Sequence, residues 1–397
     1  MARGGETGGR GAAPAAQGGQ AAQGGQAERR RLDVLIVSLG STAGLRAVDE
    51  ELLASLRRAG AGAEIARARP PRRMRTLMLT DLAWALAARR AAREALARQP
   101  ARAVIYSTTT AALLWPRPGA IRFDALAAAN RPGRHGLWQR PLERRRLREA
   151  TLLLPQSEGT LAEAPDSAPR RAGDERVLVL PVPVESSGAA VGAGVPSAAD
   201  MRDATPVRIA CAESGRDAFP ERDIAAITYA ANPAKKGLDV LLAAWARARR
   251  PGEELWVAGV AESELCVLGY ALPTEGVRVT GPLPPHDYRA LLRRARIYVC
   301  APRREDYGIA QLEALADGCM LVTVPSPGPY AALPLARDLD GRLVGADIGA
   351  AIRVALDDPS PGYAERAALA LAPFRREAVD RLVADELLSR LPAQSAR

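Results

Sequence analysis

Two glutamates separated by seven residues form the pair of side chains with the most evident chemical use in this sequence. Glu305 and Glu313 follow the apolar run from Ile297 to Pro302. The run predicts a buried strand, Gly308 predicts a turn, and the residues from Ile309 to Ala316 predict a helix. The two carboxylates therefore flank a strand-to-helix turn.

A turn of this kind suits a diphosphate group. The first backbone N–H groups of a helix lack intrahelical partners and lie at the positive end of its dipole, which here places an anion near Tyr307, Gly308 and Ile309. Eight residues of helical rise span roughly 12 Å, about the distance from the ribose of a nucleotide to a sugar on its far phosphate. Each carboxylate could therefore accept hydrogen bonds from one diol. The alternative is a pair of solvated glutamates.

The lysines give a second signal. Of 55 basic residues only Lys235 and Lys236 are lysines, and they stand side by side before Gly237. A compact ammonium can contact a phosphate oxygen where a planar guanidinium is too large. The pair therefore predicts a phosphate contact, with chance clustering on a loop as the alternative.

Both motifs resemble those of retaining glycosyltransferases of the GT-B fold, especially family 4, over most of residues 225–335. The resemblance rests on the two spaced glutamates and on the segment from Ile227 to Ala244, which is similar to the family's strand, basic loop and K-G-x-x-x-L-L-x-A helix. It implies that Glu305 contacts the donor sugar, Glu313 binds the ribose and Lys236 neutralises the pyrophosphate, with Lys235 adding charge.

The sequence also departs from this family pattern. The family usually has an arginine five or six positions before the lysine, where this chain has Ala230 and Ala231. Many members have a histidine that touches the donor sugar, and this chain offers Asp124 at the end of a predicted strand. An ionised aspartate can accept a hydrogen bond from a sugar hydroxyl but cannot donate one. Asp124 is thus either a donor contact or a helix cap.

The first half of the chain begins with a similar unit. Residues 32–38 predict a strand, and the following turn contains Gly40, Ser41 and Gly44. Backbone amides at these small residues could approach a donor phosphate or sugar. The same turn is common in any α/β domain, so a purely structural role is the alternative.

Alternating elements predict an α/β fold of the GT-B type, with two Rossmann-like domains whose parallel sheets face a cleft. The predicted strands of the second half cover residues 255–260, 277–280, 297–302, 320–324 and 341–344. We assign residues 31–185 to an acceptor-side domain, 186–205 to a linker and 206–374 to a donor domain. Residues 375–397 predict a helix that packs back on the first domain. The repeated A-A-Q-G-G-Q tract marks 1–30 as a disordered tail without the apolar core of a secretory signal.

Histidine and cysteine give few options for chemistry. His135, in a polar loop, is a candidate contact for the acceptor, and His286 suits a surface or capping role. The spacing of these side chains predicts no metal site. The scattered cysteines, Cys211, Cys266, Cys300 and Cys319, indicate reduced residues in a cytoplasmic protein.

The net charge of +10 includes seven arginines between residues 131 and 148. This segment could contact the anionic inner surface of a membrane. The alternative is that its arginines form an ordinary solvated face of the protein. Nucleic acid is not expected, because aromatic residues are only 4% of the chain. No apolar run of 18 or more residues predicts a membrane span.

The expected activity is transfer of a sugar from a nucleoside-diphosphate donor, UDP- or GDP-linked, to the hydroxyl of an unidentified glycan, lipid or small-molecule acceptor, with retention of configuration. No metal and no other cofactor is expected. Two alternatives remain, a non-catalytic nucleotide-sugar binding or scaffold protein and a GT-B nucleotide-sugar epimerase. A phosphorylase with pyridoxal phosphate is disfavoured, because the chain has no lysine outside the Lys235–Lys236 loop.

Overall fold

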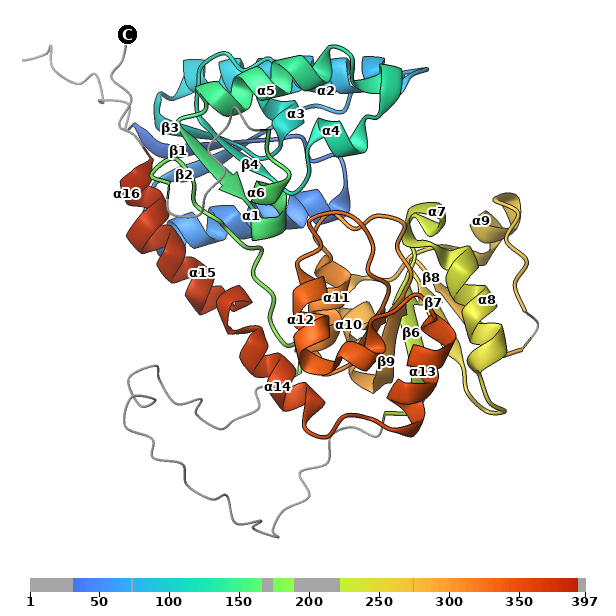
Figure 1. The fold of residues 1–397 in the computed structure, drawn as a ribbon. Helices are drawn as coiled ribbons and strands as arrows, with labels where there is room; N and C mark the ends of the chain where they lie inside the picture. The colour runs from blue at the N-terminus through green and yellow to red at the C-terminus, as the bar shows by residue number, and fades with distance from the viewer. Residues whose placement is uncertain (1–30, 73, 166–173, 189–221, 274, 392–397) are drawn as a thin grey trace, which may run out of the picture.

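The computed structural model describes residues 31–72, 74–165, 174–188, 222–273 and 275–391. The predicted tail at 1–30, most of the predicted linker and Cys211 lie outside these ranges. The described part forms two domains, each built around a five-stranded parallel sheet (Figure 1). The prediction of an α/β fold with two Rossmann-like domains is confirmed.

The first sheet has the strand order β2-β1-β3-β4-β5. Four of its strands are largely buried and apolar, as expected when helices cover both faces of a parallel sheet, whereas the edge strand β2 carries exposed Glu64 and Arg67. The strands are β1 Leu32–Ser38, β2 Ala63–Arg67, β3 Ala101–Tyr106, β4 Ala120–Phe123 and β5 Leu152–Pro155.

Ser and Thr side chains cap the N-termini of several helices in this domain. Thr42, Thr76, Thr108 and Ser157 each accept a hydrogen bond from a backbone N–H in the first turn of the helix that follows. These caps fix where the chain turns from a strand into a helix. The helices are α1 Ala43–Arg58, α2 Leu77–Arg98, α3 Thr109–Ala112, α4 Ala127–Asn130, the 3₁₀ turn η1 Gly133–Gly136, α5 Gln139–Glu149 and α6 Glu158–Ala162.

The second sheet has the order β10-β9-β6-β7-β8. Its strands are β6 Ile224–Tyr229, β7 Leu255–Ala258, β8 Val277–Gly281, β9 Ala295–Cys300 and β10 Met320–Thr323. The helices are α7 Pro233–Lys236, α8 Leu238–Ala248, α9 Glu262–Val267, α10 Pro285–Arg294, α11 Ile309–Ala316, α12 Ala332–Asp340, η2 Gly341–Leu343, α13 Ile348–Asp357, α14 Tyr363–Ala370 and η3 Ala372–Phe374. Trp245 of α8 is completely buried in the core of this domain and donates its indole N–H to the carbonyl of Gly276 at 2.7 Å.

The end of the chain returns to the first domain. α15 Arg376–Leu382, the π-helical turn Val383–Leu387 and α16 Leu388–Arg390 run along the first sheet on the side of α1 (Figure 1). Val383 and Leu387 join the core cluster that also contains Leu56 of α1. Asp380 accepts hydrogen bonds from Ser55 at 2.5 Å and from Arg58 at 2.6 Å.

Two segments therefore cross between the domains, and they lie against each other. The extended stretch 177–187 leaves the first domain, and the turn at η3 leads back to it. The backbone N–H of Val184 donates to the carbonyl of Phe374 at 2.8 Å, and the Glu185 carboxylate accepts from the backbone N–H of Arg376. The crossings thus form one paired connection.

One predicted strand, at residues 341–344, is wrong. Gly341–Leu343 form the 3₁₀ turn η2, because the Asp340 side chain accepts from the N–H of Arg342 and starts a helical turn. Val344 makes only an isolated bridge with Thr323 of β10.

Glu143 lies on α5, and its buried carboxyl group contacts the first residue of α4. It accepts hydrogen bonds from the backbone N–H of Ala127 at 2.9 and 3.1 Å. Burial raises the pKa of Glu143 from 4.5 to about 7, against the opposing effect of the Thr109 hydroxyl. A carboxyl whose pKa is higher in the folded state favours folding most below its unfolded pKa, and this contribution is lost as the pH rises through the folded pKa.

We expect the Glu143→Gln variant to lose this pH dependence, because its amide oxygen can still accept from Ala127 but cannot ionise. The free energy of unfolding of the wild type relative to the variant should fall by on the order of 3 kcal/mol between pH 4.5 and pH 8. Urea unfolding of both proteins across this range measures the difference. Parallel pH profiles for the two proteins would contradict the assignment.

Candidate functional site

The two motifs meet at the point in the second sheet where the order of the strands reverses. The chain builds β7 and β8 on one side of β6, then returns to place β9 and β10 on the other side. In open α/β sheets ligands bind outside the carboxyl ends of the strands at this switch point. The lysine loop follows β6 and the glutamate loop follows β9, so both loops lie at the expected edge.

The lysine loop is a single helical turn with defined ends. Asn232 caps α7 by accepting from the N–H of Lys235 at 3.1 Å, and Gly237 ends the turn with a φ of 63°. A Cβ at Gly237 would lie 1.9 Å from the carbonyl oxygen of Ala301, at the start of the glutamate loop. The N–H of Arg303 donates to the carbonyl of Lys235 at 3.0 Å. The two loops are therefore held in direct backbone contact.

Lys236 and Glu305 form an ion pair in this contact. The ammonium Nζ lies 2.5 Å from Oε2 of Glu305, and the exposed fractions of the two side chains are 19% and 6%. Gln311 of α11 donates to the same oxygen at 2.9 Å. The other oxygen, Oε1, has no hydrogen-bond partner among the described residues. It can accept a hydrogen bond from a ligand.

Lys235 forms a parallel but more exposed pair with Asp306. Its Nζ lies 2.5 Å from Oδ2, and 40% of the lysine side chain is exposed. Arg304 binds the second oxygen of Asp306 at 3.1 Å. Two lysine–carboxylate ion pairs thus lie side by side before the turn at Gly308.

The turn itself has the geometry that the sequence predicts. Gly308 precedes α11 with a φ of 91°, and no side chain caps the helix. A Cβ at Gly308 would lie 2.9 Å from the ring of Tyr330. Ile309 is the first residue of α11, so its N–H belongs to the uncapped turn.

Glu313 lies on α11, beyond this turn. Burial raises its pKa, and the Arg289 guanidinium at 3.4 Å opposes the effect. Arg289 also binds the buried carboxylate of Asp317 at 2.6 Å. Arg289 therefore fixes the position of Glu313 from the neighbouring helix α10.

One contact joins this turn to the crossing segment, and two contacts join the loops around it to the first domain. The Tyr307 hydroxyl accepts from the N–H of Val182 at 2.9 Å, so the Tyr307 side chain supports the crossing segment and only its backbone faces the turn. Arg304 binds Glu163 with two hydrogen bonds of 2.8 Å. Ser157 donates to the carbonyl of Pro329 at 3.0 Å.

Asp124 follows β4 directly, at the carboxyl edge of the first sheet. Burial raises its pKa, the Asp306 carboxylate raises it further, and Arg122 and Lys235 lower it. Asp124 therefore shares an electrostatic environment with the second domain. Its backbone carbonyl accepts from Thr160 at 3.1 Å.

Of the remaining predicted residues of the first domain, Gly40 is half-buried and the others are exposed. Gly40 has a φ of 59°, and its carbonyl accepts from Arg46 at 2.8 Å. Ser41 is exposed before the Thr42 cap, and Gly44 lies in the first turn of α1 with open space where a Cβ would be. His135 is exposed in η1. Within the described ranges, no hydrogen bond or ion pair joins these residues to the second domain.

Several residues at the site were not predicted from the sequence. Gln311, Arg289 and Glu163 make contacts that depend on the packing of separate elements. Ser326 Oγ and Gln311 Oε1 are buried and have no hydrogen-bond partner within the part of the chain that the structure describes. Only Gln311 could have been suspected, because it stands inside the spaced-glutamate motif.

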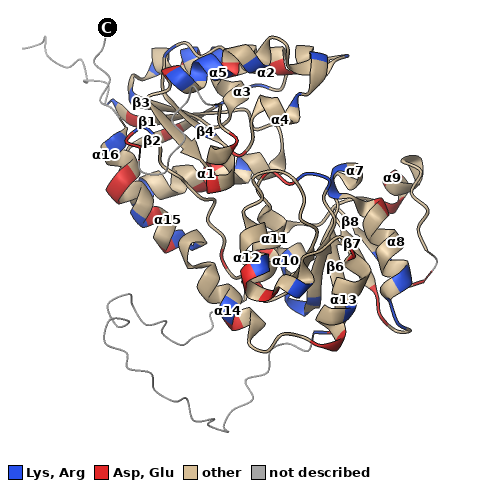
Figure 2. Cartoon of the chain, in the orientation of Figure 1, with Lys and Arg blue, Asp and Glu red and all other residues tan. Residues whose placement is uncertain are grey.

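The arginines of 131–148 have mixed roles. Figure 2 shows Lys and Arg gathered along α5. Arg131 binds Asp81 at 2.6 Å, and Arg146 lies 5.0 Å from the centre of the Trp115 ring. Arg134, Arg144 and Arg148 are exposed and have no ion-pair partner in the described ranges, and 63% of Leu137 is exposed. No helix among the described residues is long and apolar enough to cross a bilayer.

Comparisons with known proteins agree with this geometry. Residues 222–358 match the family model described as glycosyl transferases group 1, which covers both loops. The fold is GT-B. HepE from Anabaena, solved with UDP and glucose, is similar over 90% of this chain and 100% of its own, with 14% identity and a TM-score of 0.59.

Two further solved structures have the same fold. WaaG, a glycosyltransferase involved in lipopolysaccharide biosynthesis, is similar over 88% of this chain and 99% of its own, with 15% identity and a TM-score of 0.59. Sucrose-phosphate synthase from Thermosynechococcus elongatus covers 90% and 98%, with 16% identity and a TM-score of 0.57. A comparison with curated proteins found no sequence match. The family match and the fold support a glycosyltransferase.

The close approach at Gly237 gives a testable prediction. Gly237→Ala should place a methyl group against the Ala301 carbonyl, whereas Gly252→Ala, also at positive φ, meets open space. We expect a loss of about 1–2 kcal/mol for Gly252→Ala and of more than about 3 kcal/mol for Gly237→Ala, because the second must also separate the loops. Urea unfolding compares the two, and equal losses would contradict the close approach.

Proposed function

We propose that this protein transfers a sugar from a nucleoside-diphosphate donor to an acceptor hydroxyl, with retention of configuration, as in family 4 of the GT-B glycosyltransferases. The observation that carries the proposal is the Lys236–Glu305 pair, which sets a cation and a partly free carboxylate beside an uncapped helix start. This arrangement offers separate partners for a phosphate and for a sugar hydroxyl. It lies within the residues that match the family model.

In the proposed reaction the leaving group is the nucleoside diphosphate. Lys236, Lys235 and the first N–H groups of α11, beside Gly308 and Ile309, stabilise the negative charge that develops on it. The lysines leave their carboxylate partners to do so, because a phosphate competes for the same ammonium protons. These groups supply the positive charge, so we propose that no metal and no other cofactor takes part.

The carboxylates position the donor in this proposal. Glu305 accepts from a sugar hydroxyl through Oε1, and Glu313 accepts from the ribose, with Arg289 holding it in place. Asp124 and the backbone at Gly40, Ser41 and Gly44 reach the donor from the first domain. The transition state, with charge like that of an oxocarbenium ion, is held between the leaving phosphate and the acceptor.

The donor and acceptor are proposed more coarsely. HepE was solved with UDP and glucose, which favours a uridine donor here, with a guanosine donor as the second choice. The acceptor approaches from the first domain, where His135 is a candidate contact. The exposed arginines of 131–148 and Leu137 are the proposed contact with an anionic membrane if the acceptor is a lipid.

Nucleotide binding tests the two charged partners separately. Lys236→Met should lower the affinity for the preferred nucleoside diphosphate by about 10- to 100-fold, because it removes a charge-assisted hydrogen bond. Glu305→Gln should not lower it, because the substitution removes the carboxylate that competes for Lys236. Calorimetric titration of UDP, GDP, ADP and TDP measures both variants.

Glu264→Gln, on the exposed face of α9, is the control for loss of a carboxylate. Circular dichroism establishes that each variant is folded. Unchanged affinity in a folded Lys236→Met variant would exclude Lys236 as the phosphate ligand. Binding of none of the four nucleotides to the wild type would remove the basis of the proposal.

Turnover distinguishes transfer from the two alternatives. Release of nucleoside diphosphate from the matching nucleotide sugar should fall by about 100-fold in Glu305→Gln, since the substitution weakens a group aimed at the reacting sugar. Glu313→Ala should mainly raise KM, because the ribose contact is the same in ground and transition states. Rates should not change with a metal chelator, and NMR of the product should show the anomeric configuration of the donor.

Two other outcomes would each favour one of the alternatives. Tight binding without turnover would favour the scaffold protein. Conversion of the donor sugar to its epimer would favour the epimerase.

A further inference from the structure

A second concave site lies in the first domain, away from the donor turn. It is a hollow of about 440 Å³ between the edge strand β2 and the second half of α2. This volume is typical of small-molecule sites. Its lining contains four arginines and one glutamate, with small and apolar side chains between them. The lining residues are Ile65, Ala66, Arg67, Arg69, Leu86, Ala87, Arg90, Ala91, Glu94 and Arg98.

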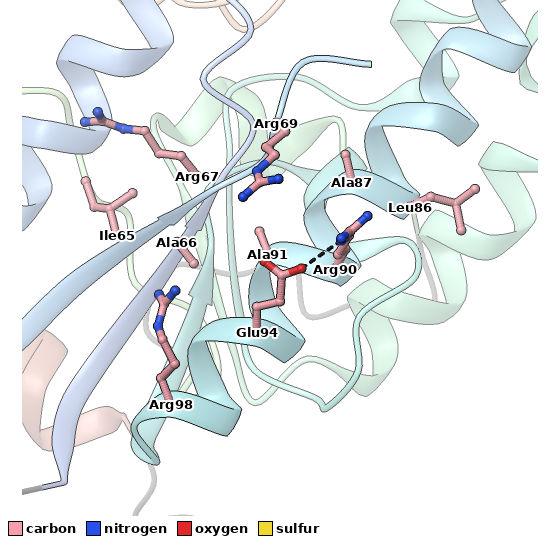
Figure 3. Close-up of a pocket in the computed structure, with 10 residues that line it drawn as sticks. All are labelled: Ile65, Ala66, Arg67, Arg69, Leu86, Ala87, Arg90, Ala91, Glu94 and Arg98. Carbon is pink, nitrogen blue, oxygen red and sulfur yellow. Dashed lines mark hydrogen bonds and ion pairs between the residues drawn. The ribbon is translucent and has the colours of Figure 1, made fainter. Parts of the chain in front are cut away.

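Three of the arginines are arranged around the single glutamate. Figure 3 shows Arg69 reaching the hollow from the segment after β2, and Arg90 and Arg98 reaching it from α2, while Arg67 points away. Arg90 binds Glu94 at 2.7 Å, and Arg67 binds Glu50 outside the hollow. Arg90, Arg69 and Arg98 all lower the pKa of Glu94, so their charges act at the same place.

The lining of this hollow contains more arginines than carboxylates. Arg69 has no ion-pair partner within the described part of the chain, and Glu94 is the only carboxylate in the lining. Several guanidinium groups that converge from two elements suit an anion with several oxygens, because each planar fork can bind a different pair of oxygens. Phosphate meets this requirement better than a single carboxylate.

The uncharged part of the lining bears on the chemical group to which a bound phosphate would be attached. Ile65, Leu86 and three alanines form an uncharged wall, and no aromatic side chain is present for a nucleobase to stack on. The volume exceeds that of a phosphate alone, so the hollow has room for an uncharged body attached to a phosphate.

We propose that the hollow between β2 and α2 binds the phosphate group of a phosphorylated ligand, either a free small molecule or a lipid headgroup. None of its lining residues belongs to the donor turn or to the second domain. The site is thus separate from the one that holds the proposed nucleotide. It brings a phosphorylated compound to the domain on which the acceptor is expected.

Three single variants test this site by the sign of their effect. Arg69→Ala should weaken binding of inorganic pyrophosphate by about tenfold, because it removes one charge-assisted partner from a segment outside any helix or strand. Glu94→Gln should strengthen binding, because it removes the only carboxylate that competes for Arg90. Arg93→Ala removes the same charge from an exposed position of α2 outside the hollow and should have no effect.

Calorimetry measures these affinities, with Lys236→Met as a reference for pyrophosphate bound at the donor turn. A second arm measures sedimentation with phosphatidylcholine vesicles that contain or lack phosphatidylglycerol. Pyrophosphate binding that depends on Arg69 assigns a free ligand, and binding to anionic vesicles alone that depends on Arg69 assigns a lipid headgroup. The proposal is overturned if neither probe binds, if Arg69→Ala and Arg93→Ala behave alike, or if Lys236→Met removes all binding of pyrophosphate and no vesicle binding depends on Arg69.

Discussion

The carboxyl edge of the second sheet depends on one partly buried ion pair between two loops that follow neighbouring strands. Lys236 and Glu305 can meet only because Gly237 lets the lysine loop touch the backbone at Ala301. Without Lys236 or another cation in its place, the buried carboxylate of Glu305 would keep only the hydrogen bond from Gln311, which is unfavourable for a buried charge. The pair therefore sets the relative position of both loops. It also keeps an ammonium beside the start of α11, where the backbone already favours an anion.

The residues next to this pair in sequence connect it to the other domain. Arg304 binds Glu163, and Tyr307 accepts from Val182, so the segment that presents Glu305 also holds the first domain. A displacement of either domain would pull on the loop that contains the carboxylate. Arg289 has a similar double role, since it holds Glu313 and donates to the backbone carbonyl of Glu185 in the crossing segment. Both glutamates of the motif are thus linked to the connection between the domains.

The sequence predicted the elements whose signals are local. Apolar runs ended by glycine identify β9 and α11, and the isolated lysine pair identifies the loop after β6, which the structure brings beside Glu305. The partners supplied by packing could not be predicted in the same way. Glu163 stands 141 positions from Arg304, and nothing in either segment marks the other. The predicted strand at 341–344 failed because a short apolar stretch fits a 3₁₀ turn as well as an edge strand, and the capping role of Asp340 decided between them.

The paired crossing segments determine how the two domains can move. A single extended connection would leave the domains free to twist, slide and rotate about it. Here the backbone of Val184 is bonded to that of Phe374, and Glu185 holds the start of α15. Two connections bonded side by side restrict sliding and twisting more than a single connection does. Rotation about the paired segments is therefore the relative movement of the two sheets that these contacts oppose least.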